Sequence, residues 1–193
     1  MSLPSPPPLP PVIGHRGARG HAPENTLAGL ARARELGALW VEFDVKLTAD
    51  GVPILMHDDT LKRTTDGRGD VAARSLAEIR ALDAGRWFSA SFAGEGVPTL
   101  DEAMAFLASR GMGANVEIKP CPGRAEETGA VVARALAARW TGMALPPFVS
   151  SFSAAALAAA YRAAPDIPRG LVADRVPADW GAQLAELGCM TFH

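Results

Sequence analysis

Histidines, cationic side chains and carboxylates recur in four short groups along this chain. The first two are Gly14-His15-Arg16-Gly17 and Glu42-Phe43-Asp44. His57-Asp58 and Glu117-Ile118-Lys119 follow later, and each group lies within or directly after a short apolar run. Carboxylates can hold a cation, histidines can move protons and cationic side chains can bind an anion. Together these residue types indicate chemistry on a phosphoryl group.

The carboxylates of Glu42 and Asp44 are two residues apart in a predicted strand over residues 39–47, so they point to the same face. Val41, Phe43 and Val45 then point to the other face. Strands covered by helices are normally apolar on both faces. A row of charged side chains on one face therefore favours a metal site or the mouth of a barrel over an ordinary solvent-exposed strand.

Glu117 and Lys119 repeat this geometry on a predicted strand over residues 115–119. A third carboxylate from a second strand would complete a site for a hard cation. Oxygen ligands without nearby cysteine or paired histidine favour Mg²⁺ or Ca²⁺ over Zn²⁺. Lys119 would bind a phosphate oxygen or offset the carboxylate charge. The alternative is a buried Glu117–Lys119 ion pair without a metal.

His15 and His57 each follow a predicted strand and precede a polar loop, where two histidines can act as general base and general acid. The alternative for each is a hydrogen-bonded structural histidine. Arg16 suits bidentate contact with a phosphate, and the glycines beside it allow close approach of the backbone to a ligand. Two roles stay open for Asn25, which is either a helix cap or a site residue, and for Glu24, which is either a first-turn charge or a supporting partner of the site.

Helical and strand patterns alternate along the chain. Strands are predicted over residues 12–15, 39–47, 52–56, 115–119, 148–152, 169–173 and 189–192. Helices are predicted over residues 25–36, 76–82, 99–109, 126–139, 154–163 and 180–187. Thr99 and Glu102 have the spacing of a capping box, and Asp50-Gly51 is a hairpin turn signal.

Six main strands with intervening helices predict a parallel α/β fold with right-handed crossovers. A complete (β/α)8 barrel typically needs ~250 residues. The chain ends at His193, after its sixth main strand, so the last two βα units are expected to be lacking and the natural protein to be longer. Two exposed strand edges would result. A small open α/β sheet is the competing architecture.

Composition limits the remaining possibilities. With 193 residues, 48% of them hydrophobic, the chain can form one domain over residues 12–193, after a disordered or extended lead-in over residues 1–11. A net charge of −2 without a basic run argues against nucleic-acid binding. Cys121 and Cys189 fit buried thiols. Neither a membrane span nor a signal peptide is evident, so we expect a cytoplasmic protein without stable membrane association. Oligomeric state, including a homo-oligomer, is open.

The ordered set of these groups, with Pro23-Glu24-Asn25-Thr26 between the first two, resembles the glycerophosphodiester phosphodiesterases, most closely the bacterial cytoplasmic type. The resemblance implies a TIM (β/α)8-type barrel with a small insertion after the second strand, at about residues 59–98. Metal ligands would be Glu42, Asp44 and Glu117, with His15 and His57 as the acid–base pair. Arg16 and Lys119 would contact the phosphate.

The resemblance also implies a substrate class. Glycerophosphocholine or glycerophosphoethanolamine would be hydrolysed to glycerol 3-phosphate and an alcohol in a reaction that depends on Mg²⁺ or Ca²⁺. Two alternatives are a phospholipase-D-like or cyclising lyase on intact lipids and a non-catalytic barrel that binds phosphodiesters. The aromatic pair Trp87-Phe88, with Phe92, would line a substrate channel or form a local hydrophobic cluster.

Overall fold

Six parallel strands form one curled sheet in the computed structural model, which describes residues 9–139 and 144–193. The strand order is β1-β2-β4-β5-β6-β7, and β3 pairs antiparallel with β2. The strands are β1 (Gly14–His15), β2 (Trp40–Leu47), β3 (Pro53–Leu55), β4 (Gly113–Ile118), β5 (Phe148–Ser151), β6 (Arg169–Leu171) and β7 (Thr191–Phe192). The expected lead-in over residues 1–11 lies mostly outside the described residues.

Helices follow the strands in the predicted order. They are α1 (Leu27–Glu35), α2 (Leu76–Arg80), α3 (Leu100–Ser109), α4 (Ala125–Arg139), α5 (Ala154–Ala163) and α6 (Trp180–Leu187). Two short 3-10 helices, η1 (Val71–Ala73) and η2 (Ala90–Phe92), were not predicted. All the helices and strands that were predicted are present, and their ends differ from the predicted ends by at most a few residues.

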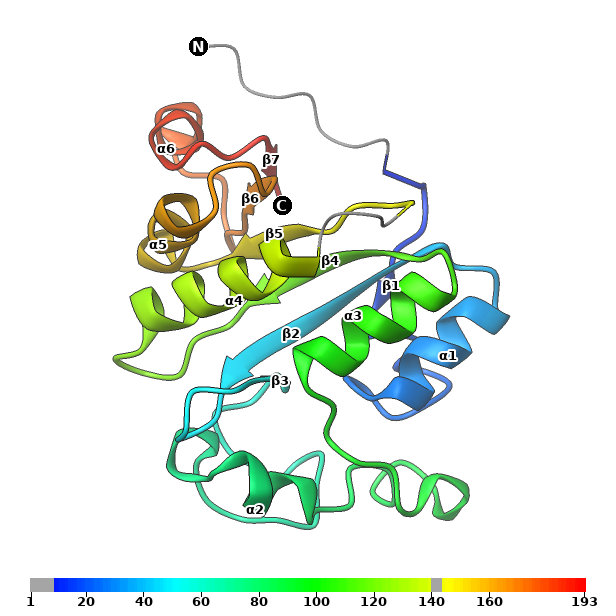
Figure 1. Ribbon diagram of the computed structural model, residues 1–193. Coiled ribbons are helices and arrows are strands. Elements are labelled where there is room, and N and C mark those ends of the chain that lie inside the picture. Colours follow the sequence, from blue (N-terminus) through cyan, green and yellow to red (C-terminus); the bar gives the residue numbers. More distant parts are fainter. Residues whose placement is uncertain (1–8, 140–143) are drawn as a thin grey trace.

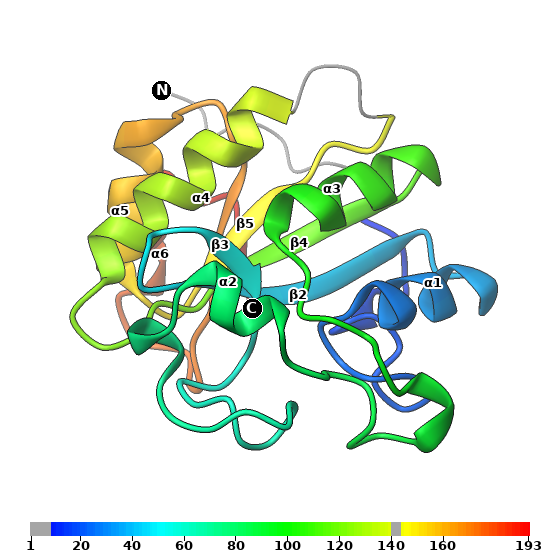
Figure 2. The ribbon, with the colours of Figure 1, turned by 60° about the horizontal axis from the view of Figure 1, so that its bottom comes forward.

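The two faces of β2 have opposite chemistry, as its alternating sequence predicts. Val41, Phe43 and Val45 are fully buried in the main apolar core, together with residues of α1, α3, α4 and α5. These four helices therefore cover the same, convex face of the sheet (Figures 1 and 2). Glu42, Asp44 and Lys46 point to the concave face.

Helices on one face of a curled parallel sheet are the arrangement of a (β/α)8-type barrel, and the fold is a partial barrel with six of its parallel strands. This result favours the barrel over the competing open sheet, because a doubly wound sheet carries helices on both faces. Within the described residues, β1 and β7 are the two edges of the sheet.

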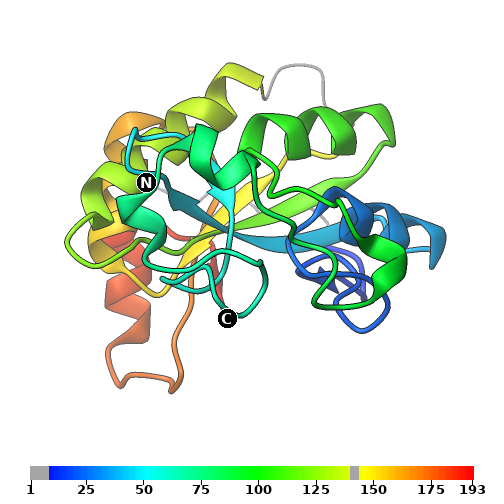
Figure 3. The same cartoon turned by 90° about the horizontal axis from the view of Figure 1, so that it is seen from below.

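The insertion between β3 and α3 lies at the carboxyl end of β2 and has an apolar core of its own (Figures 1 and 3). That core includes Leu61, Val71 and Ile79 of the insertion, together with Ile54 of β3. The ring of Phe88 packs edge to face on the rings of both Trp87 and Phe92, with ring centroids 5.7 Å apart in each of the two pairs. These three residues form a local cluster, which was one of the two alternatives for them.

The loop after β1 is pressed against α1. Gly17 has a φ of 82°, and a Cβ atom at this position would lie 2.6 Å from the backbone of Gly29. A side chain at either position would push the loop away from the helix. The glycines thus allow the backbone of this loop to lie directly against α1. This contact fixes the position of His15 and Arg16, which directly precede Gly17.

The predicted capping box begins α3. Thr99 Oγ1 accepts a hydrogen bond from Glu102 N (3.2 Å), and Thr99 N donates one to Glu102 Oε2 (2.8 Å). We expect Thr99→Ala to lower the free energy of unfolding by about 1 kcal/mol, because the helix loses its side-chain cap. Thr99→Ser keeps the hydroxyl and should retain most of this stability. Urea unfolding of the three proteins measures the difference, and equal stability of Thr99→Ala and wild type would contradict it.

Candidate active site

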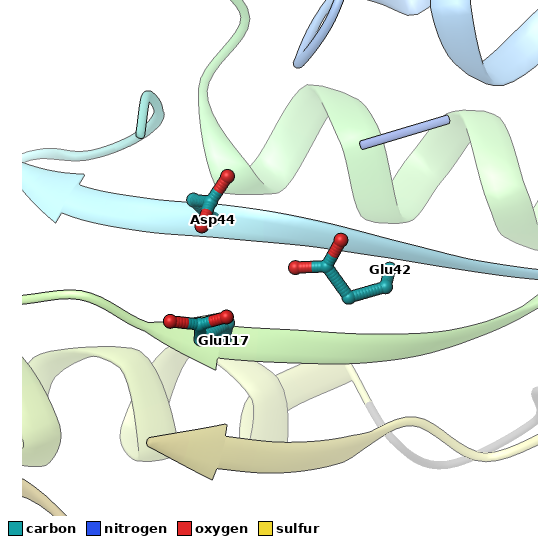
Figure 4. Close-up of side chains that lie close together, drawn as sticks. All are labelled: Glu42, Asp44 and Glu117. Atoms are coloured by element: carbon teal, nitrogen blue, oxygen red, sulfur yellow. The ribbon is translucent and has the colours of Figure 1, made fainter. Parts of the chain in front are cut away.

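Three carboxylates converge on the concave face of the sheet. Asp44 of β2 pairs in register with Glu117 of β4, and Glu42 lies two residues before Asp44 on the same face. Each of the three offers a carboxylate oxygen, and these oxygens lie within 4.8 Å of one another. Figure 4 shows the three side chains close together, Glu42 and Asp44 on β2 and Glu117 on the neighbouring β4. The structure thus brings together the three residues that the sequence suggested as metal ligands.

The three carboxylates are poorly hydrated. Asp44 is 1% exposed, and the side chains of Glu42 and Glu117 are 12% and 14% exposed. Burial, reinforced by the negative charge of Asp44, raises the pKa of Glu42 to about 8. Glu42 Oε1 is buried without a hydrogen-bond partner among the described residues. A buried carboxylate oxygen without a partner calls for an explanation, such as a bound ion.

Arg16 contacts two of these carboxylates from the loop after β1. Its backbone N–H donates to Glu42 Oε2 (3.0 Å), and its Nε lies 3.3 Å from Asp44 Oδ2. The backbone of Arg16 has a φ of 52°, a left-handed conformation that is unusual for a residue with a side chain. Backbone strain of this kind is concentrated at functional sites.

Lys119 approaches the cluster from the end of β4. Its Nζ lies 3.1 Å from Glu117 Oε1 and 3.6 Å from Asp44 Oδ1. The Glu117–Lys119 ion pair that was weighed as an alternative is therefore present, and it forms part of the carboxylate cluster. The exposed ring of Phe152 lies beneath the ammonium group, 5.6 Å from Nζ. Three carboxyl groups thus share two cationic partners among the described residues, so ionisation of all three leaves an excess of negative charge.

Asn25 orients Asp44. Its Nδ2 donates to Asp44 Oδ2 (2.9 Å), and its Oδ1 accepts from Asp44 N (3.2 Å). The helix cap is Thr26, whose side chain accepts from Gly29 N, so of the two alternatives for Asn25 the site residue is the one observed. Asn25 also has a positive φ of 56°, and asparagine is a residue that tolerates this conformation. Because Asn25 directly precedes the N-cap residue Thr26, the sequence did not distinguish a capping role from contact with Asp44.

His15 lies at the open side of the cluster. Its Nε2 is 3.8 Å from Glu42 Oε2, and its side chain is 53% exposed. Partial burial and the charges of Arg16 and Arg19 lower the pKa of His15. The imidazole is therefore neutral at pH 7 and can accept a proton.

His57 belongs to a second group of side chains beside the first. Its Nδ1 lies 2.6 Å from Asp58 Oδ1. Hydrogen bonds from Arg63 lower the pKa of the Asp58 carboxyl, so Asp58 is ionised and accepts the bond. Nδ1 consequently carries the proton, and Nε2 is left available for proton transfer.

Glu24 and Arg63 connect the two groups. Glu24 Oε1 accepts from Arg16 Nη1 (2.8 Å), and Arg63 donates to both Glu24 and Asp58. Although burial opposes ionisation, the bonds from Arg63 and Arg16 lower the pKa of Glu24 to about 2. Glu24 is thus the supporting partner that was one of its two alternatives. Arg63 was not predicted as a site residue, because its only signal in the sequence is its position a few residues after His57-Asp58.

Comparison with known proteins agrees with this geometry. The profile of the glycerophosphoryl diester phosphodiesterase family matches residues 15–193. The chain belongs to this family. The predicted resemblance to this family is therefore confirmed.

One similar solved structure is that of a phosphodiesterase from Oleispira antarctica in complex with the product sn-glycerol-3-phosphate. It is 45% identical, with a TM-score of 0.92, over 96% of this chain and 74% of that chain. A glycerophosphodiester phosphodiesterase from Agrobacterium tumefaciens is 32% identical, with a TM-score of 0.73, over 92% of this chain and 83% of that chain. Both likenesses support the barrel assignment.

Among curated relatives, a glycerophosphodiester phosphodiesterase from Caldanaerobacter subterraneus is 48% identical over 108 residues. That match covers 56% of this chain and 44% of the relative. The chain therefore matches less than half of this relative's length. In the described part of the chain, no helix is both long enough and apolar enough to cross a membrane.

The buried charge of Glu42 predicts how stability depends on pH. A carboxyl whose pKa is higher in the folded than in the unfolded state favours folding at low pH, and this contribution is lost as pH rises through the folded pKa. In EDTA, we expect the wild type to lose stability between about pH 4.5, the ordinary value for Glu, and about pH 8. Each unit of pKa difference corresponds to about 1.4 kcal/mol.

Glu42→Gln removes the ionisation, so its stability relative to the wild type should rise from pH 5 to pH 8. Urea unfolding at the two pH values measures this change. Glu186→Gln, on an exposed position of α6, is the control and should follow the wild type. An identical pH response of Glu42→Gln and wild type would contradict the prediction.

Proposed function

We propose that this chain hydrolyses glycerophosphodiesters to glycerol 3-phosphate and an alcohol. The observation that carries the proposal is the convergence of Glu42, Asp44 and Glu117 beside Arg16 and His15, at the concave face of a barrel sheet. Family membership supports the same reaction. The sn-glycerol-3-phosphate bound to the Oleispira antarctica enzyme supports the proposed product. Glycerophosphocholine and glycerophosphoethanolamine are the proposed substrates.

Glu42, Asp44 and Glu117 would hold a divalent cation, Mg²⁺ or Ca²⁺. The donor set supports this assignment, because it is made of carboxylate oxygens and Glu42 Oε1 has no other partner among the described residues. When bound, such a cation neutralises phosphate charge and polarises the P–O bond.

Arg16 and Lys119 would bind the phosphate. Arg16 Nε is buried without a hydrogen-bond partner in the described structure, so it has a donor to offer. Lys119 is 28% exposed and can reach an anion at the mouth of the site. Both cationic groups lie within 4 Å of Asp44. A phosphate held beside the carboxylates would therefore meet fixed positive charge from two sides.

His15 and His57 would transfer the protons. One imidazole takes a proton from the nucleophile, whose oxygen forms the new bond to phosphorus. The nucleophile is either water or the glycerol 2-hydroxyl, and in the second case water then opens the cyclic phosphate. The other gives a proton to the alcohol oxygen as its bond to phosphorus breaks. A neutral His15 can take up a proton, and the Asp58 carboxylate beside His57 Nδ1 would stabilise the imidazolium form that a proton-donating His57 requires.

We expect His15→Ala and His57→Ala each to lower kcat by about 10²- to 10⁴-fold, because each removes one proton-transfer group. The measurement is release of glycerol 3-phosphate from glycerophosphocholine, with circular dichroism and urea unfolding as controls for folding. Replacement of the exposed loop residue His21 by Ala should leave kcat unchanged. Turnover close to wild type in either active-site variant would remove that histidine from the chemistry.

We expect EDTA to abolish release, and Mg²⁺ or Ca²⁺ to restore it. Glu117→Gln should raise the cation concentration needed for half-maximal activity by at least 10-fold, since it removes one of three charged ligands. A titration of activity against each cation measures this shift. Full activity in EDTA would contradict the metal assignment. A persistent cyclic phosphate would identify the lyase alternative, and binding without turnover would identify the non-catalytic one.

A further inference from the structure

Arg63 occupies an unusual place among the arginines of the insertion. Arg74 and Arg86 pair with acidic residues three or four positions away in their own segment, and Arg80 pairs with Glu102 of the adjacent α3. Arg63 instead reaches Glu24, 39 positions earlier in the chain, in the loop before α1. Its guanidinium thereby links the insertion to the loop that carries Arg16.

The guanidinium of Arg63 makes two bidentate contacts. On one side, Nε donates to Asp58 Oδ2 (2.7 Å) and Nη2 donates to Asp58 Oδ1 (2.9 Å). On the other side, Nη1 and Nη2 donate to the two oxygens of Glu24, at 2.9 and 2.8 Å. All three guanidinium nitrogens are engaged, and only a planar fork can satisfy both carboxylates in this way.

Each carboxylate then contacts a residue of the proposed reaction. Asp58 Oδ1, which Arg63 holds, is the atom next to His57 Nδ1. Glu24 Oε1, also held by Arg63, accepts from Arg16 Nη1, and Arg16 Nε lies against Asp44. The result is a continuous chain of charged contacts from His57 through Arg63 to Arg16.

We propose that Arg63 is a positioning residue that orients His57 through Asp58 and Arg16 through Glu24, so that the proton-transfer group and the phosphate-binding group are set by one guanidinium. This inference rests on the proposed function, since it assigns Arg63 a role in the same reaction. Arg63 itself is not a catalytic residue. Its side chain is 42% exposed, so its contacts add little to the packing of the core.

Arg63 contacts His57 through Asp58 (the His57 branch) and Arg16 through Glu24 (the Arg16 branch). Kinetic constants of single variants can separate these two branches. Asp58→Asn cuts the His57 branch and should mainly lower kcat. Glu24→Gln weakens the Arg16 branch and should mainly raise KM. Arg63→Met cuts both, and we expect it to lower kcat/KM on the order of 100-fold, the loss typical of misplaced reacting groups.

Double variants test whether the residues act together. If Arg63 acts through Asp58, the kcat of Arg63→Met with Asp58→Asn should be close to that of the more damaged single variant. The same holds for KM when Arg63→Met is combined with Glu24→Gln. Multiplicative losses in both pairs would overturn the proposal, as would kcat/KM of Arg63→Met within threefold of wild type.

Two further variants separate positioning from charge and stability. Arg63→Lys keeps the positive charge but not the fork, so it should unfold at nearly the wild-type urea concentration while retaining the kinetic defect. Full recovery of kcat/KM in Arg63→Lys would reduce the role of Arg63 to charge alone. Arg74→Met, which removes an exposed arginine paired with one carboxylate of the same insertion, should leave all kinetic constants unchanged.

A second readout does not require turnover. The ¹⁵N ring signals of His57, assigned with His57→Gln, report which nitrogen carries the proton. In the wild type the proton should reside on Nδ1, and Arg63→Met should shift the signals toward a mixture of the two tautomers. Unchanged signals would overturn the positioning role even in an active enzyme. A protein that shows the shift but hydrolyses no glycerophosphodiester would refute the proposed function and leave the positioning role of Arg63 supported.

Discussion

Mutual repulsion of three carboxylates on the concave face of the sheet is the constraint around which the site is organised. Glu42, Asp44 and Glu117 are drawn together by strand register, in surroundings that hydrate them poorly. Such a cluster requires compensating charge or hydrogen-bond donors. The Arg16 backbone N–H and the Lys119 ammonium supply part of this compensation. The charge that stays uncompensated among the described residues is the physical basis for the cation that we propose at this site.

The compensating groups come from segments that are distant in the chain. Arg16 and Asn25 reach the cluster from the loop between β1 and α1, because Gly17 allows that loop to press against Gly29. Lys119 arrives at the end of β4, beside the carboxyl end of β2. Parallel strands place all their carboxyl ends on one side of the sheet, so residues from separate βα units meet there.

The insertion adds a second layer to this arrangement. It packs around a small core of its own, and it holds His57, Asp58 and Arg63 against the loop that carries Glu24. Charge alternates along the contacts from Asp58 to Arg63, Glu24 and Arg16, so each group stabilises the ionised form of the next. These contacts hold the insertion in a fixed relation to the sheet.

Local patterns in the sequence determined the elements and the candidate ligands. The alternation of Val41, Phe43 and Val45 with charged residues encodes two faces of a strand, and the Thr99–Glu102 spacing encodes a helix start, because both depend on neighbours along the chain. Tertiary structure alone decided that Asn25 orients Asp44 and that Arg63 joins Glu24 to Asp58. These contacts cross between separate segments, and one sequence carries no periodic signal for a partner 19 or 39 positions away.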